Sequence, residues 1–306
     1  MESALPAVAD RLDVKVGFAC NNRCRFCVQG RKRERYPRRS FDQVADFLKR
    51  HARSYRGVVF TGGEPCLHPD LLRLVAHARE LGFESIQIQT NGRMLAYARL
   101  CRDLIAAGVS EFSPALHGHS AACHDYHTRS PGSFEQTVRG IRNLVNLGQK
   151  VVSNTVVTRS NFRHLPALAE LLAGLGVAQL QFAFVHPVGT AGREALFDSV
   201  VPRLELVAPW LHRGLERAEQ AGLRAMSEAV PYCFMVEYER FVGERIMPRT
   251  RILDAEGEIA DYRAYRLEEG KAKGEPCSSC RLQGQCEGPW REYVERFGWG
   301  EFEAIS

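Results

Sequence analysis

The sequence has no hydrophobic run of the length that a membrane-spanning helix needs, and its first residues lack the basic start and apolar stretch of a signal peptide. It also has no internal repeat and no low-complexity segment. With 45% hydrophobic and 25% charged residues among 306, the composition excludes disordered, collagen-like and coiled-coil chains. We therefore expect a globular, cytoplasmic protein with one large domain, alone or with an appendage.

A large excess of one charge is also missing, because the net charge is only +5. This value does not by itself indicate a nucleic-acid partner. The sequence has one local basic run. If it forms a solvated loop, it needs no functional explanation. If it lies near a redox site, it could attract an acidic electron donor or an anionic substrate. Nucleic acid is weakly supported, since the only aromatic residue within the run is Tyr36. The run consists of Arg31, Lys32, Arg33, Arg35, Arg38 and Arg39, with Glu34 as the single acid.

Apolar, β-branched segments alternate with stretches of helical period, which is the pattern of βαβ units. Ser40 can cap one helix, Gly82 stops another, and Ser133 with Gln136 forms the pattern of a capping box on a helix that Gly148 closes. Six such units predict a parallel sheet with right-handed crossovers, hence an α/β fold with a partial (β/α)6 barrel. The predicted strands are residues 14–19, 57–61, 85–90, 111–117, 150–158 and 180–187.

The alternation breaks down after about Gly222, where a charged, mixed region with a cysteine cluster begins. The prediction is therefore a core of residues 1–222 and a small cysteine-rich extension of residues 223–306.

Cysteine is abundant, with ten residues, and disulfides are rare in reduced compartments. Three of them, Cys20, Cys24 and Cys27, lie within eight residues directly after the first predicted strand. Three thiolates on one loop can hold a cubane iron–sulfur cluster and leave one iron without a protein ligand. A zinc loop or three incidental thiols are the alternatives, although zinc needs a fourth ligand.

The C-x3-C-x2-C loop, with Phe26 before its last cysteine, resembles the cluster motif of the radical S-adenosylmethionine (radical SAM) superfamily. Two further motifs support the resemblance. The sequence from Thr61 to Pro65, TGGEP, follows the second predicted strand and resembles the GGEP motif of the family, and the sequence Thr90-Asn91-Gly92 follows the third.

The resemblance implies a [4Fe-4S] cluster and SAM as cofactors, and an electron donor of the flavodoxin or ferredoxin type. Gly62 and Gly63 would let the backbone approach a ligand closely, and Glu64 would accept a hydrogen bond from an ammonium group. Phe26 would lie near adenine. The remaining SAM-site residues that the resemblance suggests are Thr90, Asn91 and Asn154.

The fourth predicted strand departs from the family pattern. Many relatives carry a serine where this chain has Ala115, two residues before His117. Ser113 could replace that serine as a contact to SAM only if the strand register allows.

A second group of cysteines, Cys277, Cys280 and Cys286, has the spacing C-x2-C-x5-C and resembles the core of the SPASM extension. The match is partial, because Trp290 stands where another cysteine is expected and Cys233 alone represents the upstream pair. Four cysteines could close one auxiliary [4Fe-4S] cluster, as in twitch-type extensions. A zinc site made by the same thiolates and a three-cysteine site open to substrate remain alternatives.

The loop after the fourth predicted strand is rich in possible ligands, with His117, His119, Cys123, His124 and His127. Their spacing is irregular, and the segment resembles one in sulfatase-maturase-like relatives in which an acidic residue stands at the position of His117. We therefore expect His117 to face substrate and the other histidines to be satisfied by hydrogen bonds within the loop.

Three cysteines lie outside the two groups. Cys101 has helical spacing with apolar neighbours and is expected to pack in the core. Cys66 and Cys123 lie in loops near the predicted active-site mouth, where a thiol could donate a hydrogen atom to a substrate radical, as in an epimerase.

The sequence predicts a radical SAM enzyme that acts on a peptide or protein side chain or on a small metabolite. The cysteine loop lies close to the first residue, so a peptide substrate is expected to need a separate recognition protein or direct docking. The alternative is a non-catalytic iron–sulfur or zinc protein that binds a partner through its basic loop, but such a protein would have no need of the Glu64 turn.

Overall fold

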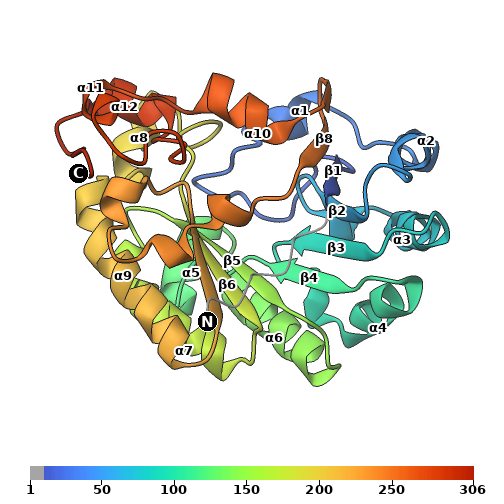
Figure 1. Ribbon diagram of the computed structural model, residues 1–306. Helices are drawn as coiled ribbons and strands as arrows, with labels where there is room; N and C mark the ends of the chain where they lie inside the picture. Colours follow the sequence, from blue (N-terminus) through green and yellow to red (C-terminus); the bar gives the residue numbers. More distant parts are fainter. Residues whose placement is uncertain (1–9) are drawn as a thin grey trace, which may run out of the picture.

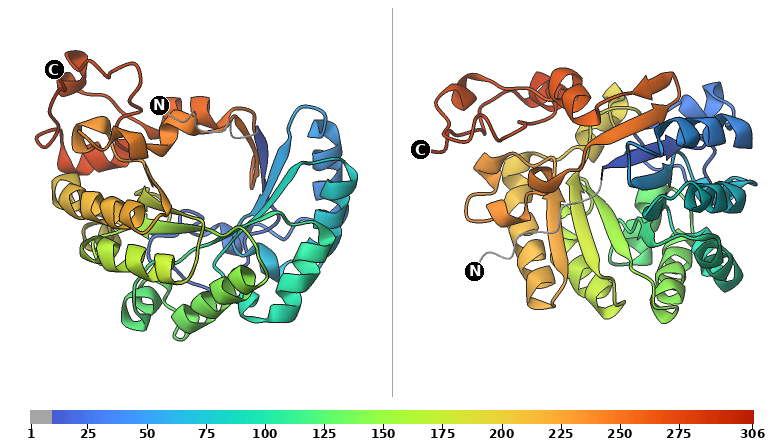
Figure 2. Two further views of the ribbon diagram at one scale, coloured as in Figure 1. Left: turned by 60° about the horizontal axis from the view of Figure 1, so that its bottom comes forward. Right: turned by 45° about the vertical axis from the view of Figure 1, so that its right-hand side comes forward.

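The computed structural model describes residues 10–306, and its strands form a curved row with helices on the outside (Figures 1 and 2). The strand orders are β4-β3-β2-β1-β8-β9 in one sheet and β5-β6-β7 in the other. Two isolated parallel bridges, Phe112 to Val151 and Ala115 to Asn154, connect β4 with β5. The α/β partial-barrel prediction is confirmed. The strands are β1 Arg11–Lys15, β2 Gly57–Thr61, β3 Ser85–Thr90, β4 Glu111–Pro114, β5 Val152–Val157, β6 Gln179–Phe184, β7 Arg224–Glu228, β8 Thr250–Asp254 and β9 Gly257–Ile259.

The helices follow the strands in the expected alternation. Ser40 caps α2 with the full capping box, its hydroxyl accepting from the Gln43 amide. The α-helices are α1 Lys32–Arg35, α2 Phe41–His51, α3 Leu71–Glu80, α4 Ala98–Ala107, α5 Ala121–Thr128, α6 Ser133–Asn146, α7 Leu165–Gly174, α8 Glu194–Val200, α9 Leu204–Gln220, α10 Tyr262–Tyr265, α11 Glu275–Ser278 and α12 Arg291–Phe297.

The predicted capping box at Ser133 is wrong. Ser133 is already the first residue of α6, and Gly132, which has no side chain, is the N-cap. The carboxylate of Asp125 takes over the capping role, because it accepts from the amides of Gly132 and Phe134 and from the Ser133 hydroxyl at 2.7 to 2.8 Å. A residue of α5 thus caps α6, which is a tertiary contact that local spacing does not reveal.

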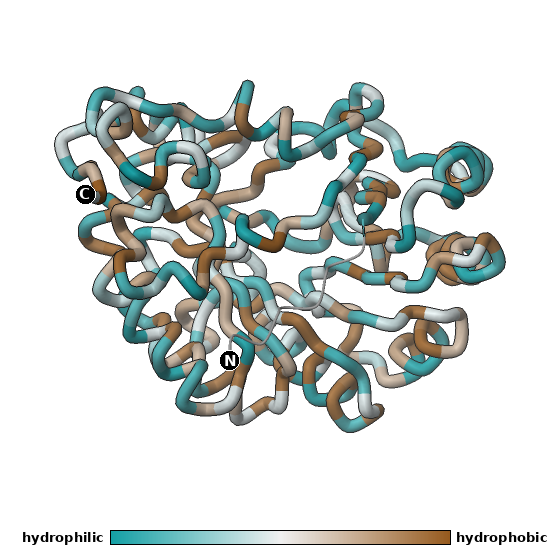
Figure 3. Tube along the Cα trace, viewed as in Figure 1, coloured by the Kyte–Doolittle hydropathy of each residue, from teal (hydrophilic) through white to brown (hydrophobic). Residues whose placement is uncertain are grey.

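The two faces of the strands differ in polarity. In β3, Ile86 and Ile88 are buried in the hydrophobic core, whereas Gln87 and Gln89 point to the opposite face, because side chains alternate along a strand. The same alternation appears in β6, where Leu180 and Phe182 are fully buried. Hydrophobic residues accordingly recur at intervals along the strands and helices rather than in one block (Figure 3). In both strands the apolar face packs under the helices, and the inner face carries glutamines.

The first strand is shorter and lies earlier than predicted. The expected strand of residues 14–19 is replaced by β1, which ends at Lys15. Residues 17–19 instead pair with a turn, since the amides of Gly63 and Glu64 donate to the carbonyls of Gly17 and Ala19. The segment is extended, but the turn does not continue the ladder.

Strand formation also continues past the predicted boundary at residue 222. β7 pairs in parallel with β6, and β8 pairs in parallel with β1, so the second segment adds a strand to each open edge of the barrel. The C-terminal segment then lies across the open side (Figure 2). The division into residues 1–222 and 223–306 stays a prediction. Among the described residues, no helix combines the length and the apolar character needed to cross a membrane.

Candidate active site

The three cysteines of the N-terminal loop lie together at the carboxyl end of β1. All three are half-buried, and burial, followed by the neighbouring thiols of Cys27 and Cys20, raises the pKa of the Cys24 thiol. The loop is fixed to the end of α5, because the amides of Arg23 and Arg25 donate to the carbonyls of Thr128 and His127 at 2.9 and 3.0 Å. One anchored loop therefore presents three thiols to a common region, as an iron–sulfur cluster with one open iron requires.

The two glycines of the TGGEP turn are needed for contact between backbones. A Cβ atom on Gly62, whose φ is +126°, would lie 2.1 Å from the carbonyl oxygen of Gly17, and one on Gly63 would lie 2.3 Å from that of Ala19. The expectation that these glycines admit a ligand is therefore refined. Their observed neighbour is the segment that leads into the cysteine loop, so they hold turn and loop together.

Gly63→Ala is expected to force the turn away from residues 18 and 19 and to weaken SAM binding by about tenfold or more, since both close contacts are with backbone atoms. Gly174→Ala is the matched control, because a Cβ atom on Gly174, at the end of α7, would meet nothing within 4 Å. Equilibrium binding of SAM to both reconstituted variants checks the prediction. Equal affinities would show that the turn tolerates the methyl group.

Glu64 joins the ends of the first three strands. Its carboxylate is 3% exposed and accepts from the Thr90 hydroxyl at 2.7 Å, the Asn91 amide at 2.7 Å and the Cys66 amide at 3.0 Å. Burial raises the pKa of this carboxyl, and the three hydrogen bonds oppose the shift. Because a carboxylate has about four acceptor positions, one remains for an incoming ammonium group.

Arg93, which no predicted motif includes, connects the third strand to the cysteine loop. Its guanidinium donates to the carbonyl of Asn21, to the side chain of Asn22 at 3.0 Å and to Gln136 at 2.6 Å. Asn91 reinforces the connection through a 2.6 Å hydrogen bond to the Asn21 side chain. The sequence did contain a sign of this contact, because a basic residue directly follows the TNG motif and two asparagines lie in the cysteine loop.

A second unpredicted contact comes from the loop after β6. The amide of Thr190 donates to the carbonyl of Cys27 at 2.9 Å. Gly189 has φ +62°, and a Cβ atom there would lie 2.4 Å from the same carbonyl oxygen. The cysteine loop is thus also held from the far side of the barrel.

His117 lies against Phe26, with 4.7 Å between ring centroids in an edge-to-face arrangement. Burial lowers the pKa of His117 well below its usual range, so the ring is neutral near pH 7, and its Nδ1 accepts from the Val156 amide at 3.2 Å. Of its two ring nitrogens, Nε2 therefore carries the proton. His117 can offer a neutral N–H donor, but it is not a ready general acid.

The predicted loop is in part a helix, because Cys123, His124 and His127 lie in α5, and the other histidines are only partly satisfied by hydrogen bonds. His127 is engaged at both ring nitrogens, by the Cys123 carbonyl and by the Thr158 hydroxyl. His124 accepts from the His117 amide through Nδ1, but its buried Nε2 has no partner, and neither does the buried Nδ1 of His119. Of these three histidines, His127 alone has both ring nitrogens engaged, and one of its partners, Thr158, lies outside the segment in which the contacts were expected.

The three remaining thiols differ in their surroundings. Cys101 is fully buried, as expected for packing. Cys66 is half-buried beneath the turn, with its sulfur 3.8 Å from the Thr90 hydroxyl. Cys123 is half-buried with its sulfur 3.9 Å from the His117 carbonyl, and burial raises its pKa to about 11. Both latter thiols lie next to predicted site residues.

The strand register allows the side chain of Ser113 to face the barrel interior, as a contact to SAM would require. Ser113 pairs with Gln89 of β3, which places both residues on the inner face. Ala115 pairs with Asn154 on the other side, and the buried Oδ1 of Asn154 has no hydrogen-bond partner. Such an orphaned atom is typical of a site that a ligand or water completes.

The four cysteines of the C-terminal segment line one cavity, although Cys233 is far from the others in sequence. The Cys286 and Cys277 thiols contribute, after burial, to a Cys233 pKa raised to about 12. Cys280 lines the same cavity. Within residues 10–306, no three histidine, cysteine or acidic side chains are placed to hold a single metal ion.

Several side chains of the basic run make ion pairs or hydrogen bonds with other parts of the protein. Lys32 pairs with Asp254 at 2.7 Å, and Arg39 donates to the Asp254 carbonyl. Arg33 donates to the carbonyl of Asn22 in the cysteine loop at 3.1 Å. The exposed members of the run are Arg31, which pairs with Glu34, together with Arg35 and Arg38. Only part of the run therefore resembles a solvated loop.

Residues 14–172 match the model of the Radical SAM superfamily, which covers about half of the chain. The chain belongs to the radical SAM superfamily. A [4Fe-4S] cluster and SAM are accordingly its cofactors. The thiols of the N-terminal loop, the Glu64 turn and the unpartnered oxygen of Asn154 fit these groups chemically.

Radical SAM relatives of different names resemble the chain in sequence. It is 30% identical over 243 residues to an AdoMet-dependent heme synthase of Oleidesulfovibrio alaskensis, with 79% of the chain and 62% of the relative covered. It is 31% identical over 184 residues to a probable GTP 3',8-cyclase of Saccharolobus solfataricus, with 58% of each covered. The chain thus spans less than two thirds of the length of these relatives.

Two solved structures share the fold of this chain. SuiB of Streptococcus suis, bound to its precursor peptide SuiA, superposes with a TM-score of 0.68 at 14% identity, covering 98% of this chain and 76% of SuiB. Native anSMEcpe with bound AdoMet and Cp18Cys peptide gives a TM-score of 0.66 at 15% identity, covering 92% of this chain and 89% of anSMEcpe.

Proposed function

We propose that this radical SAM protein abstracts a hydrogen atom from a peptide or protein side chain or from a small metabolite. When bound, the reduced cluster supplies one electron that cleaves SAM, and the resulting 5′-deoxyadenosyl radical takes the hydrogen atom. The observation that carries the proposal is the joining of the cysteine loop, the Glu64 turn and the Thr90-Asn91 segment at the carboxyl ends of β1, β2 and β3. These contacts support catalysis over a partner-binding iron–sulfur protein.

The chain's own residues would position SAM. Cys20, Cys24 and Cys27 would hold the cluster, and Glu64 would accept from the methionine ammonium group with its remaining acceptor position. Phe26 would face the adenine. Asn154, whose Oδ1 is unpartnered, would accept from SAM or from a group next to it. Hydrogen bonds from Thr90 and Asn91 hold the Glu64 carboxylate in place and oppose the rise in its pKa that burial causes.

The decisive experiment is anaerobic reconstitution followed by an assay for 5′-deoxyadenosine. We expect SAM binding and reductive cleavage. Well-reconstituted protein that neither binds nor cleaves SAM would refute the proposed function. The same samples give the iron content.

We also propose that Cys233, Cys277, Cys280 and Cys286 hold an auxiliary [4Fe-4S] cluster, since all four line one cavity. The expected iron content is about eight per chain, and Cys233→Ala is expected to lower it toward about four without removing SAM cleavage. Iron and zinc analysis of both proteins checks this. About four irons with stoichiometric zinc in the unmodified protein would instead favour a zinc site.

The sequence relatives and the structural neighbours favour different substrate classes. Relatives by sequence are named heme synthase and GTP cyclase, which favours a small metabolite, whereas structural neighbours contain bound peptides. His117, neutral and next to Phe26, is proposed to face the substrate as a hydrogen-bond donor.

Cys66 and Cys123 are proposed as the candidate hydrogen-atom donors to a substrate radical. Cys66→Ala and Cys123→Ala test each thiol separately by the rate of product formation once a substrate is known. If one thiol is the donor, its variant should still cleave SAM but lose product by about two orders of magnitude or more. A full rate of product formation removes that residue from the mechanism.

An acidic flavodoxin or ferredoxin-type protein is proposed as the electron donor. Arg35 and Arg38 are exposed in the segment that follows the cysteine loop, where positive charge would speed encounter with an acidic partner. The ten free thiols suit a reducing, cytoplasmic setting.

A further inference from the structure

The inner face of the barrel carries carboxamide side chains on strands that lie far apart in sequence. Gln89 belongs to β3, which lies between β2 and β4, yet its side chain is exposed. Since Ile88 is fully buried on the opposite face, the exposed side of Gln89 is the inner one. An uncharged polar group is therefore open to a molecule inside the barrel.

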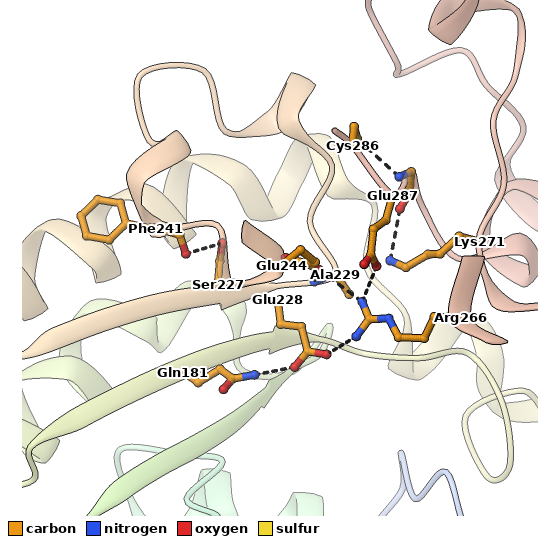
Figure 4. A network of polar contacts seen from close by, with 11 residues as sticks. Gln181, Ser227, Glu228, Ala229, Phe241, Glu244, Arg266, Lys271, Cys286 and Glu287 are labelled. Carbon is orange, nitrogen blue, oxygen red and sulfur yellow. Dashed lines mark hydrogen bonds and ion pairs between the residues drawn. The ribbon is translucent and has the colours of Figure 1, made fainter. Parts of the chain in front are cut away.

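Gln181 of β6 lies on the same inner face, and its orientation is fixed. Its Nε2 donates to Glu228 of β7 (Figure 4). Because an ionised carboxylate only accepts hydrogen bonds, the amide nitrogen must face Glu228, and the Oε1 acceptor of Gln181 stays free of that contact. Gln181 thus offers an oxygen to the barrel interior.

A buried ion cluster holds Glu228 in place. Arg266, only 2% exposed, donates to Glu228 at 2.5 Å and to Glu287 at 2.8 Å, with Glu244 at 3.3 Å (Figure 4). The Lys271 ammonium lies 3.9 Å over the ring of Trp290 beside this cluster. The side chain of Glu228 is 25% exposed, so its charge is felt on the inner face. Glu228 is the most exposed of the three acids in the cluster, so it is the one whose carboxylate can act on a molecule inside the barrel.

Gln181 pairs directly with Asn154 of β5, so the two side chains stand side by side. The buried Oδ1 of Asn154 has no partner. Two oxygen acceptors next to an anchored carboxylate form an environment that attracts N–H donors and repels anions.

We propose that Gln181, with Gln89 across the barrel, binds an N–H-bearing uncharged or cationic part of the substrate, such as a peptide amide or an amine, and disfavours anionic groups. Gln181 and Gln89 are specificity-determining residues, and Arg266 is a positioning residue that acts through Glu228. This inference rests on the proposed function for the presence of a substrate, but it concerns binding rather than radical chemistry.

The test uses three probes on one scaffold: the N-acetyl, N-methylamide derivatives of lysine, alanine and glutamate. Binding to the reconstituted, SAM-bound protein is measured by saturation-transfer NMR and titration, and SAM affinity is measured in parallel. We expect the lysine and alanine probes to bind and the glutamate probe to bind more weakly. Gln181→Met and Gln89→Met should weaken binding of the first two probes by about tenfold each, which is the effect of one lost hydrogen bond.

Gln220→Met is the matched control, because Gln220 is exposed at the end of α9 on the outside of the barrel, and it should change nothing. Equal or tighter binding of the glutamate probe, unchanged binding in Gln181→Met and Gln89→Met, or no binding of any probe would overturn the inference. A parallel loss of SAM affinity in these variants would also overturn it, because the residues would then belong to the SAM site. Failure of the proposed function is seen separately, as absence of SAM binding before any probe is added.

Discussion

In a Cys24→Ala variant, SAM cleavage is expected to fall below detection, by about three orders of magnitude or more, because a cubane with only two protein thiolates is not retained. Cys24 is the middle cysteine of the loop. After burial, the neighbouring thiols of Cys27 and Cys20 contribute most to the rise in its pKa. Cys66, the next cysteine along the chain, lies beneath the TGGEP turn, where its sulfur contacts the Thr90 hydroxyl. The measurements are 5′-deoxyadenosine formation and the visible and EPR spectra of the reduced protein.

Cys101→Ala is the control for this variant. Cys101 is buried in α4 with its sulfur 3.2 Å from the Leu95 carbonyl, so its loss should cost about 1 kcal/mol of stability and leave cleavage intact. Retention of full SAM cleavage in Cys24→Ala would contradict the assignment of the loop as the cluster site. Iron content distinguishes loss of the cluster from loss of the fold, because the auxiliary iron should remain.

Arg266→Met is expected to lower the free energy of unfolding by about 3–5 kcal/mol, because it leaves three carboxylates without their shared cation. Arg266 donates to Glu228 of β7 and to Glu287, which directly follows Cys286. It therefore connects β7 to the C-terminal segment that carries the cysteines. The loss should therefore appear first as detachment of the C-terminal segment. Chemical denaturation and hydrogen exchange of residues 262–306 measure it.

The pH dependence of this variant gives a second readout. Burial raises the pKa of Glu244, so the folded state binds its proton more tightly than the unfolded state does. Stability lost at pH 8 should therefore be partly regained as the pH falls toward 5. The double variant Arg266→Met/Glu244→Gln should recover part of the loss at pH 8, since it removes one uncompensated charge.

Arg296→Ala is the matched control for Arg266→Met. Arg296 also contacts two acids, Asp198 and Glu194, but its side chain is 40% exposed. Its loss should cost much less stability than the loss of Arg266, because water screens exposed ion pairs. Equal losses in the two variants would show that the buried cluster contributes no more than a surface pair.

Strand positions were predictable where local pattern and tertiary structure agree. β2 and β3 have the predicted bounds, because a continuous apolar run in β2 and an alternating pattern in β3 end at the TGGEP turn and at the TNG segment. The prediction failed where a distant partner decides the geometry. Residues 17–19 look like strand but pair with the TGGEP turn, and Asp125 caps α6 from another helix.

The sequence by itself determined the cofactor chemistry of this protein. Cysteine spacing and the motifs at two successive strand ends are local features, and a βαβ pattern brings successive strand ends to one edge. They therefore identified the superfamily before any fold was known.

Only the tertiary structure decided how the remaining residues assemble. Cys233 shares a cavity with three distant cysteines, Gln181 and Asn154 stand side by side on neighbouring strands, and Arg266 is buried among acids from three segments. These relations depend on strand register and on docking of the C-terminal segment, which are set by long-range packing and not by neighbours in the chain.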